Sequence, residues 1–341
     1  MKLYDDYLNT IKTAISADRK SRSHLSTFSE SKDSFYKAFS YADFNAQVPQ
    51  MQLLPSLNNL ANEIGLVPNF NQKLGLHPDF AYLKGTDKIE NHYIVSVFID
   101  IKGSTQLFSK YDPETVLIIN TTIQRAAIHT CLVFGGYIHR LQGDGLFVYF
   151  GGKNITPEES TLRALQSTSV FTYFVKNDLK KLFEEQDIDK IFTRIGIDFG
   201  KTEDVIWSMA GIGEISEVTT CSLHTSLASK MQASAESNGI VVGDNIRTNT
   251  KLQFQELMQS VSKRTGDESD RYIYRIPGDK FFYTQYDLAW LRFLKMQPFI
   301  VTDFQGEISI KGSTSTSKNI ENLRPIASQN KPYFNGKRKF S

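Results

Sequence analysis

Two aspartates occur where a divalent metal ion could bind. Asp100 follows a dense apolar run, Val95–Ile99, and precedes the sequence Ile-Lys-Gly-Ser-Thr at 101–105. Asp144 lies in a Gly-Asp-Gly turn between two apolar runs, a pattern that predicts a β-hairpin. Two carboxylates that meet at one edge of a sheet suit Mg²⁺ or Mn²⁺, which keep water and phosphate oxygens as further ligands. The two acids are therefore candidate ligands for a metal-bound triphosphate.

The residues after Asp100 offer contacts for phosphate. Gly103, Ser104 and Thr105 predict a turn into a helix, and backbone N–H groups at a helix N-terminus attract anions. A purely local role is the alternative, because aspartate commonly caps helices and occupies turns. The combination of the 98–105 sequence with Arg-Leu-Gln-Gly-Asp at 140–144 favours the metal site over two unrelated structural aspartates.

Strands and helices alternate from Tyr93 onward. This pattern predicts an α/β fold of the α+β kind, with a mixed sheet and an inserted antiparallel hairpin that would lie beside the first strand. The expected elements are a strand at 95–99, a helix after Pro113, hairpin strands at 137–142 and 146–150, a helix from about 157 to 183, strands at 192–199 and 205–209, a helix at 223–234 and a strand at 240–242.

The flanks of this region are less regular. Residues 1–90 begin with a helical pattern, contain a Ser-rich stretch at 21–31, and continue with loop signals around four prolines. After 260 we expect a strand at 272–276, a strand and a helix within 281–299, a polar tract at 311–318 and a basic tail. The predicted organisation is an N-terminal extension (1–90), a central domain (91–260) and a C-terminal extension (261–341).

Composition excludes several broad classes. The chain has 341 residues and a formal net charge of +2, so no global field marks it as a nucleic-acid or membrane-surface binder. Its two cysteines predict no disulfide framework. The first residues lack the pattern of a signal peptide, and the longest apolar run, 94–101, is too short to span a bilayer. We expect a soluble cytoplasmic protein without a membrane span.

The two aspartate motifs resemble the class III adenylate and guanylate cyclase family, and the resemblance covers residues 93 to about 245. It implies a ferredoxin-like catalytic domain in which Asp100 and Asp144 bind two metal ions, Mn²⁺ or Mg²⁺, with the backbone carbonyl of Ile101 as a further ligand. The ribose 3′-hydroxyl of a nucleoside triphosphate would attack the α-phosphorus in line. A homodimer with active sites shared between subunits is also implied.

By the same resemblance, Arg140 and Thr219 occupy the positions that face the base, where adenylate-forming members have lysine and aspartate. The pattern is similar to that of the pyrimidine cyclases of bacterial Pycsar anti-phage systems. The forked donors of arginine match the adjacent acceptors N3 and O2 of cytosine, which favours CTP over UTP. Adenylate cyclase activity is a further alternative. The implied product is cyclic CMP, a second messenger for a separate effector protein.

Two positions depart from the family pattern. Ser226 stands where the family has a ribose-orienting asparagine, and Lys230 where it has a phosphate-binding arginine. These departures leave open an inactive cyclase-like module that senses nucleotides, although retention of both metal aspartates argues against it. A diguanylate cyclase is disfavoured because the hairpin turn reads Gln-Gly-Asp-Gly-Leu rather than Gly-Gly-Glu-Glu-Phe.

Overall fold

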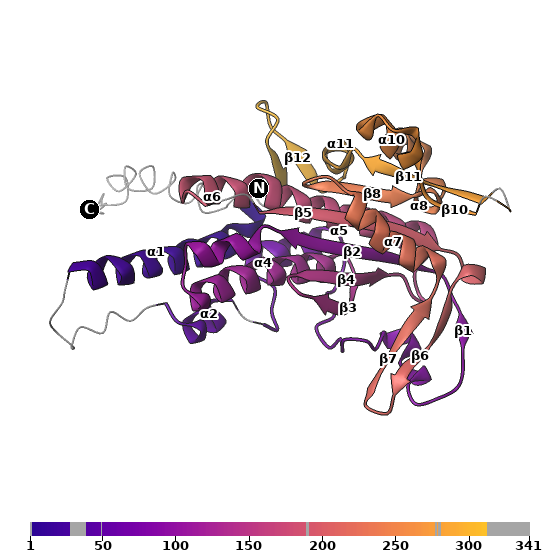
Figure 1. Cartoon of the computed structure of the whole chain (residues 1–341), viewed down its shortest axis with the longest axis horizontal. Helices are drawn as coiled ribbons and strands as arrows, with labels where there is room; N and C mark the ends of the chain where they lie inside the picture. The colour runs from indigo at the N-terminus through magenta and orange to yellow at the C-terminus, as the bar shows by residue number, and fades with distance from the viewer. Residues whose placement is uncertain are drawn as a thin grey trace, which may run out of the picture.

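The computed structural model describes residues 2–27, 39–48, 50–188, 191–276, 278 and 281–311 (Figure 1). The basic tail and all but the first residue of the polar tract 311–318 lie outside the described residues.

A large mixed sheet forms the centre of the described part of the chain. Its eight strands follow the order β10-β11-β8-β5-β2-β4-β3, with β9 beside β11. β2 lies between β4 and β5 and is antiparallel to both, whereas β5 and β8 are parallel. The predicted mixed sheet, with the hairpin beside the first strand, is confirmed. The strands are β2 (Ile94–Lys102), β3 (Tyr137–Gln142), β4 (Gly145–Phe150), β5 (Phe192–Gly200), β8 (Gly239–Gly243), β9 (Met258–Ser260), β10 (Tyr272–Ile276) and β11 (Phe281–Leu288).

Helices cover both faces of this sheet (Figure 1). On one side α4 (Pro113–Val133) and α5 (Pro157–Tyr173) pack over the inward side chains of β2, such as Val97. On the other side α7 (Leu223–Ser234) packs on β5 and β2, close to Phe98. Because side chains alternate along a strand, Asp100 lies on the α7 side.

The helix predicted from about 157 to 183 is confirmed, but it is not uniform. It continues from α5 through a π-helical segment, η4 (Phe174–Leu179), into α6 (Lys180–Glu185). One helix of the described residues, α4, is long and apolar enough to cross a membrane, and 67% of its most apolar stretch is buried inside the protein. A buried helix in the core of a soluble protein can be equally long and apolar, so α4 is weak support for a membrane span.

The N-terminal region packs on the central sheet's helical layer. α1 (Asp5–Thr27) lies along α4, and the hydroxyl of Tyr4 hydrogen-bonds that of Thr130 at 2.6 Å. The stretch in which the sequence predicts loops contains two short helices, α2 (Tyr41–Gln47) and α3 (Pro55–Glu63). Pro55 occupies the first turn of α3, where a missing N–H is tolerated.

A small second sheet extends from the main one and carries Thr219, one of the residues that the sequence analysis singles out. It consists of β1 (Glu90–Asn91), β6 (Ile206–Ile212) and β7 (Ile215–Cys221), and its hairpin points away from the main sheet in Figure 1. The remaining elements are η1 (Lys2–Tyr4), η2 (Pro78–Leu83), η3 (Ser104–Ser109), η5 (Thr202–Asp204), α8 (Asp244–Thr248), α9 (Leu252–Gln255), α10 (Val261–Thr265), η6 (Glu268–Arg271), α11 (Trp290–Lys295), β12 (Ile300–Thr302) and β13 (Ile308–Ile310).

Candidate active site

The structure brings Asp100 and Asp144 to the same edge of the sheet. Ile99 on β2 faces Leu146 on β4, so the hairpin turn reaches the end of β2. A methyl group at Gly145 would lie 2.4 Å from the carbonyl oxygen of Ile99 and 3.3 Å from the Cα of Asp100. Only glycine allows this approach of the two backbones. The Gly-Asp-Gly turn therefore holds its aspartate against the strand that carries the other acid.

Positive groups surround the carboxylate of Asp100. Its Oδ2 atom lies 3.2 Å from Nη2 of Arg194 and 3.1 Å from Nζ of Lys102. The same oxygen accepts a hydrogen bond of 3.0 Å from Nε2 of Gln232 on α7. A metal ion at Asp100 would therefore compete with these two cations for the carboxylate.

Asp144 is held by the segment after β2. Its Oδ2 atom accepts a short hydrogen bond from the hydroxyl of Ser104, which is buried. Gly103 has a φ of 95°, which turns the chain sharply into η3. The helix that the sequence predicts here is this six-residue 3₁₀ helix, and the side chain of Thr105 is exposed.

The ligand types fit a hard divalent cation. Two aspartate carboxylates and the backbone carbonyl of Ile101 supply only oxygen, which Mg²⁺ and Mn²⁺ prefer. Within the described residues there is no group of three or more His, Cys, Asp or Glu side chains placed to hold a metal ion. Any ion at this edge would thus need further ligands, such as phosphate oxygens or water.

Arg140 and Thr219, the two residues predicted to face the base, have different polar partners. The Nε atom of Arg140 donates to Oε2 of Glu217 on β7 at 2.7 Å, and its Nη2 atom makes a second, very short ion pair with the same carboxylate. The hydroxyl of Thr219 instead lies 3.1 Å from Nε2 of His139. Arg140, Glu217 and His139 line one open hollow of 540 Å³ between β3 and the β6–β7 hairpin.

Two local features accompany this arrangement. The pairing of β3 with β4 shifts between Ile138 and Arg140, which is a β-bulge beside the site. Burial lowers the pKa of His139 to about 3, and the positive charge of Arg140 adds to the effect, so its imidazole is neutral. Sequence reasoning missed Glu217. Glu217 lies two residues before Thr219, and residues at this spacing share one face of a strand, so its position relative to Thr219 could have indicated it.

Ser226 and Lys230 lie one turn apart on the exposed side of α7. The hydroxyl of Ser226 donates to the carbonyl of Ser222 at 3.3 Å, and Nζ of Lys230 lies 5.8 Å from the ring centre of Tyr274. Among the described residues, neither side chain forms a hydrogen bond or ion pair with Asp100 or Asp144.

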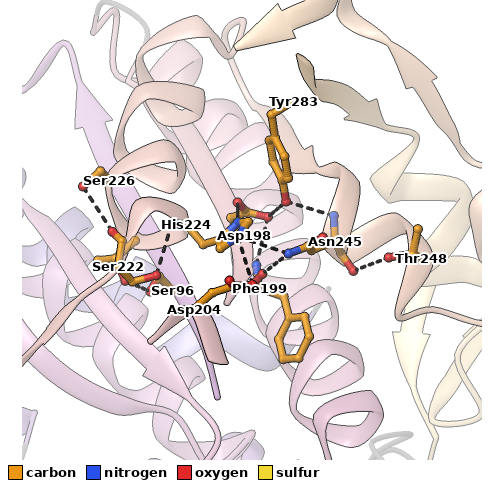
Figure 2. A network of polar contacts seen from close by, with 11 residues as sticks. Ser96, Asp198, Phe199, Asp204, Ser222, His224, Ser226, Asn245, Thr248 and Tyr283 are labelled. Carbon is orange, nitrogen blue, oxygen red and sulfur yellow. Dashed lines mark hydrogen bonds and ion pairs between the residues drawn. The ribbon is translucent and has the colours of Figure 1, made fainter. Parts of the chain in front are cut away.

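A buried polar network fixes the start of α7 (Figure 2). The carboxylate of Asp198 on β5 accepts hydrogen bonds from His224 on α7 at 2.9 Å and from Tyr283 on β11 at 2.8 Å. Burial raises the pKa of Asp198, while the hydrogen bond from His224 opposes the shift. Asn245 completes the network by donating its backbone N–H to Tyr283. A strand of the C-terminal region thereby helps to position α7.

No family model matches the chain. A cytidylate cyclase from Staphylococcus aureus is 36% identical over 257 residues, which cover 75% of this chain and 59% of that protein. A cytidylate cyclase from Escherichia coli is 30% identical over 262 residues, covering 74% of this chain and 56% of that protein. The chain thus spans little more than half the length of these curated relatives. The solved structure of the adenylyl cyclase CyaB from P. aeruginosa aligns with a TM-score of 0.48 and 17% identity, over 59% of this chain and 96% of that one.

The chain belongs to the class III nucleotidyl cyclase family. Within that family it is a homologue of proteins named cytidylate cyclase.

Proposed function

We propose that the chain is a pyrimidine nucleotide cyclase that converts CTP to 3′,5′-cyclic CMP and pyrophosphate, with UTP as the second candidate substrate. The observation that carries the proposal is the pair formed by Arg140 and Glu217 at the hollow between β3 and β7. The name that the relatives carry supports the same base.

The pair complements the edge of cytosine. The guanidinium of Arg140 donates to N3 and O2, and the carboxylate of Glu217 accepts from the N4 amine. Uracil presents a carbonyl oxygen in place of that amine, which a carboxylate would repel. The side chain of Arg140 is 44% exposed and that of Glu217 is 22% exposed, so a ligand can reach both side chains.

We assign the phosphate end of the substrate to the acidic edge. Asp100, Asp144 and the carbonyl of Ile101 would hold two Mn²⁺ or Mg²⁺ ions, which when bound supply activation of the ribose 3′-hydroxyl and neutralisation of the triphosphate. Lys102, once displaced from Asp100, is free to neutralise phosphate oxygens as a point charge. Backbone N–H groups of the turn at Gly103, Ser104 and Thr105 would add donors.

Two further contacts would come from α7. The hydroxyl of Ser226 would hydrogen-bond the ribose, and the ammonium of Lys230 would neutralise a phosphate without the bidentate geometry of arginine. Among the described residues no hydrogen bond or ion pair joins either side chain to the acids of the same chain, and we place both, with Arg140, opposite the acids of a second copy.

A head-to-tail homodimer would join these halves. The tip of the β6–β7 hairpin exposes Ile212 at 77% and Ile215 at 82%, and neighbouring Leu141 is 44% exposed. Exposed apolar side chains grouped near a polar site are typical of interfaces. In this dimer, Asp100 and Asp144 of one chain would face the base pocket of the other.

We place the enzyme in the cytoplasm, where its product would act on a separate effector protein in anti-phage defence. The resemblance to the pyrimidine cyclases of Pycsar systems supports this role.

The test is to incubate the purified chain with each of the four ribonucleoside triphosphates and Mn²⁺ and to identify the product by mass. Arg140→Ala should lower kcat/KM for CTP by roughly 5- to 150-fold, the equivalent of about 1–3 kcal/mol for a bidentate base contact. Arg264→Ala is a matched control, because Nε of Arg264 also donates to a carboxylate, that of Asp287, at 2.9 Å. Preference for ATP or GTP would refute the pyrimidine assignment, and preference for UTP would refute only the hydrogen-bond argument for cytosine.

A further inference from the structure

A short segment of the N-terminal region crosses between the two strands that carry Arg140 and Glu217. We name residues 72–76 the strap. At its centre, the backbone N–H of Gly75 donates to the carbonyl of His139 at 2.8 Å, and the carbonyl of Gly75 accepts from the N–H of Val218 at 2.7 Å. His139 precedes Arg140 and Val218 follows Glu217. One residue therefore connects the immediate neighbours of both members of the pair.

Side chains anchor the rest of the strap to β3. Oε1 of Gln72 accepts from the N–H of Ile138, and its Nε2 donates to the carbonyl of Gly136, both at 3.0 Å. The hydroxyl of Tyr137 donates to the carbonyl of Lys73 at 2.5 Å. Since β3 is the last strand on its side of the main sheet, the strap covers an edge that would otherwise present unpaired backbone groups. It also joins the main sheet to the small one.

The residue at the centre of the strap must be glycine for two reasons. Gly75 has a φ of +66°, which L-residues rarely adopt, and a methyl group there would lie 2.7 Å from Cβ of Glu217. Gly65 and Gly85 have similar φ values, +71° and +76°, but have no atom within 4 Å of such a methyl group. Substitutions at Gly65 and Gly85 are therefore matched controls, because they strain the backbone as at Gly75 but create no contact like that with Glu217.

We propose that the strap is a specificity-determining element: through Gly75 it sets the position of Glu217 relative to Arg140 and thereby the shape of the base pocket. This inference rests on the proposed role of that pair in reading the base. It assigns to part of the N-terminal region a positioning function in substrate choice.

The test compares Gly75→Ala with Gly85→Ala. Both variants should unfold at a lower urea concentration than the wild type because of the strained backbone, and Gly75→Ala at a somewhat lower one still because of its contact with Glu217. Selectivity is the kcat/KM for the preferred pyrimidine triphosphate divided by the kcat/KM for the other one. We expect Gly75→Ala to lower this ratio by about fivefold or more. Gly85→Ala should keep the wild-type ratio, and both should need the same Mn²⁺ concentration for half-maximal rate.

A second variant keeps the proposal testable if Gly75→Ala does not fold. Gln72→Ala removes one hydrogen bond to β3 and one to Gly136, the residue before β3, without changing a residue in contact with Glu217. It should shift the same ratio in the same direction by a smaller factor. Selectivity is also measured by calorimetry in EDTA as the ratio of dissociation constants of CMP and UMP, which have the same bases but no pyrophosphate to lose, so that the result does not depend on turnover.

The outcomes separate the two proposals. Wild-type protein that prefers a purine refutes the proposed substrate, and the strap is then judged by whether Gly75→Ala changes the purine preference. Folded Gly75→Ala and Gln72→Ala proteins with the wild-type selectivity, in both turnover and binding, would overturn the role of the strap and leave the substrate assignment intact.

Discussion

Replacing Asp100 by asparagine should separate its proposed role in catalysis from its role in the fold. The substitution removes one negative charge and keeps a carbonyl oxygen in nearly the same place. That oxygen can still accept the hydrogen bond from Gln232, whereas the attractions to Lys102 and Arg194 lose their ionic part. A metal ion at this edge would lose a charged ligand.

The two effects differ in size. The side chains of Lys102 and Arg194 are 46% and 27% exposed, so each ion pair contributes at most about 1 kcal/mol to folding. The free energy of unfolding of Asp100→Asn should therefore fall by no more than about 2 kcal/mol. Cyclisation should fall at least about a hundredfold, equivalent to about 2.7 kcal/mol of lost transition-state stabilisation.

The assay measures turnover of the preferred nucleotide with Mn²⁺ alongside urea unfolding. Asp287→Asn is the matched control, because the Asp287 side chain is 25% exposed and pairs with Arg264 at 2.9 Å but lies on β11, outside the proposed site. It should show a similar loss of stability and near-normal turnover. Near-normal turnover of Asp100→Asn, or an equal loss in both variants, would refute the metal-ligand assignment.

Three further outcomes are expected. Mixing Asp144→Asn with Arg140→Ala chains should restore partial activity, since a mixed dimer contains one intact site; no recovery despite demonstrated subunit exchange would indicate sites built within one chain. Tyr283→Phe should lower the free energy of unfolding by about 1–3 kcal/mol, because it leaves buried Asp198 short of a donor; a change below about 0.5 kcal/mol in urea unfolding would contradict this. Burial lowers the pKa of His129 to about 4, so the unfolded chain binds a proton that the folded chain does not. Stability should fall as the pH decreases from about 6.5 to about 4, by up to about 1.4 kcal/mol per pH unit for this residue, and His129→Gln should flatten the slope.

The elements that the sequence predicts best are those specified by local patterns. The hairpin from Tyr137 to Phe150 and helix α7 are found at or within a residue of their predicted bounds, because glycines in a turn and helical spacing act over a few residues. The approach of Asp100 and Asp144 was also predictable, since a hairpin beside the first strand brings both acids to one edge.

Contacts between distant segments were decided only by the tertiary structure. Nothing near Arg140 in the sequence indicates that its partner is Glu217, or that Gly75 bridges their strands, because each contact joins residues more than sixty positions apart. Asp198 likewise accepts a hydrogen bond from Tyr283 of the C-terminal region, which opposes the rise in its pKa that burial causes. The sequence by itself determined which carboxylates are available at the edge of the sheet, whereas the packing of distant segments, Leu74 and Gly75 among them, decided which side chains line the hollow that contains Arg140 and Glu217.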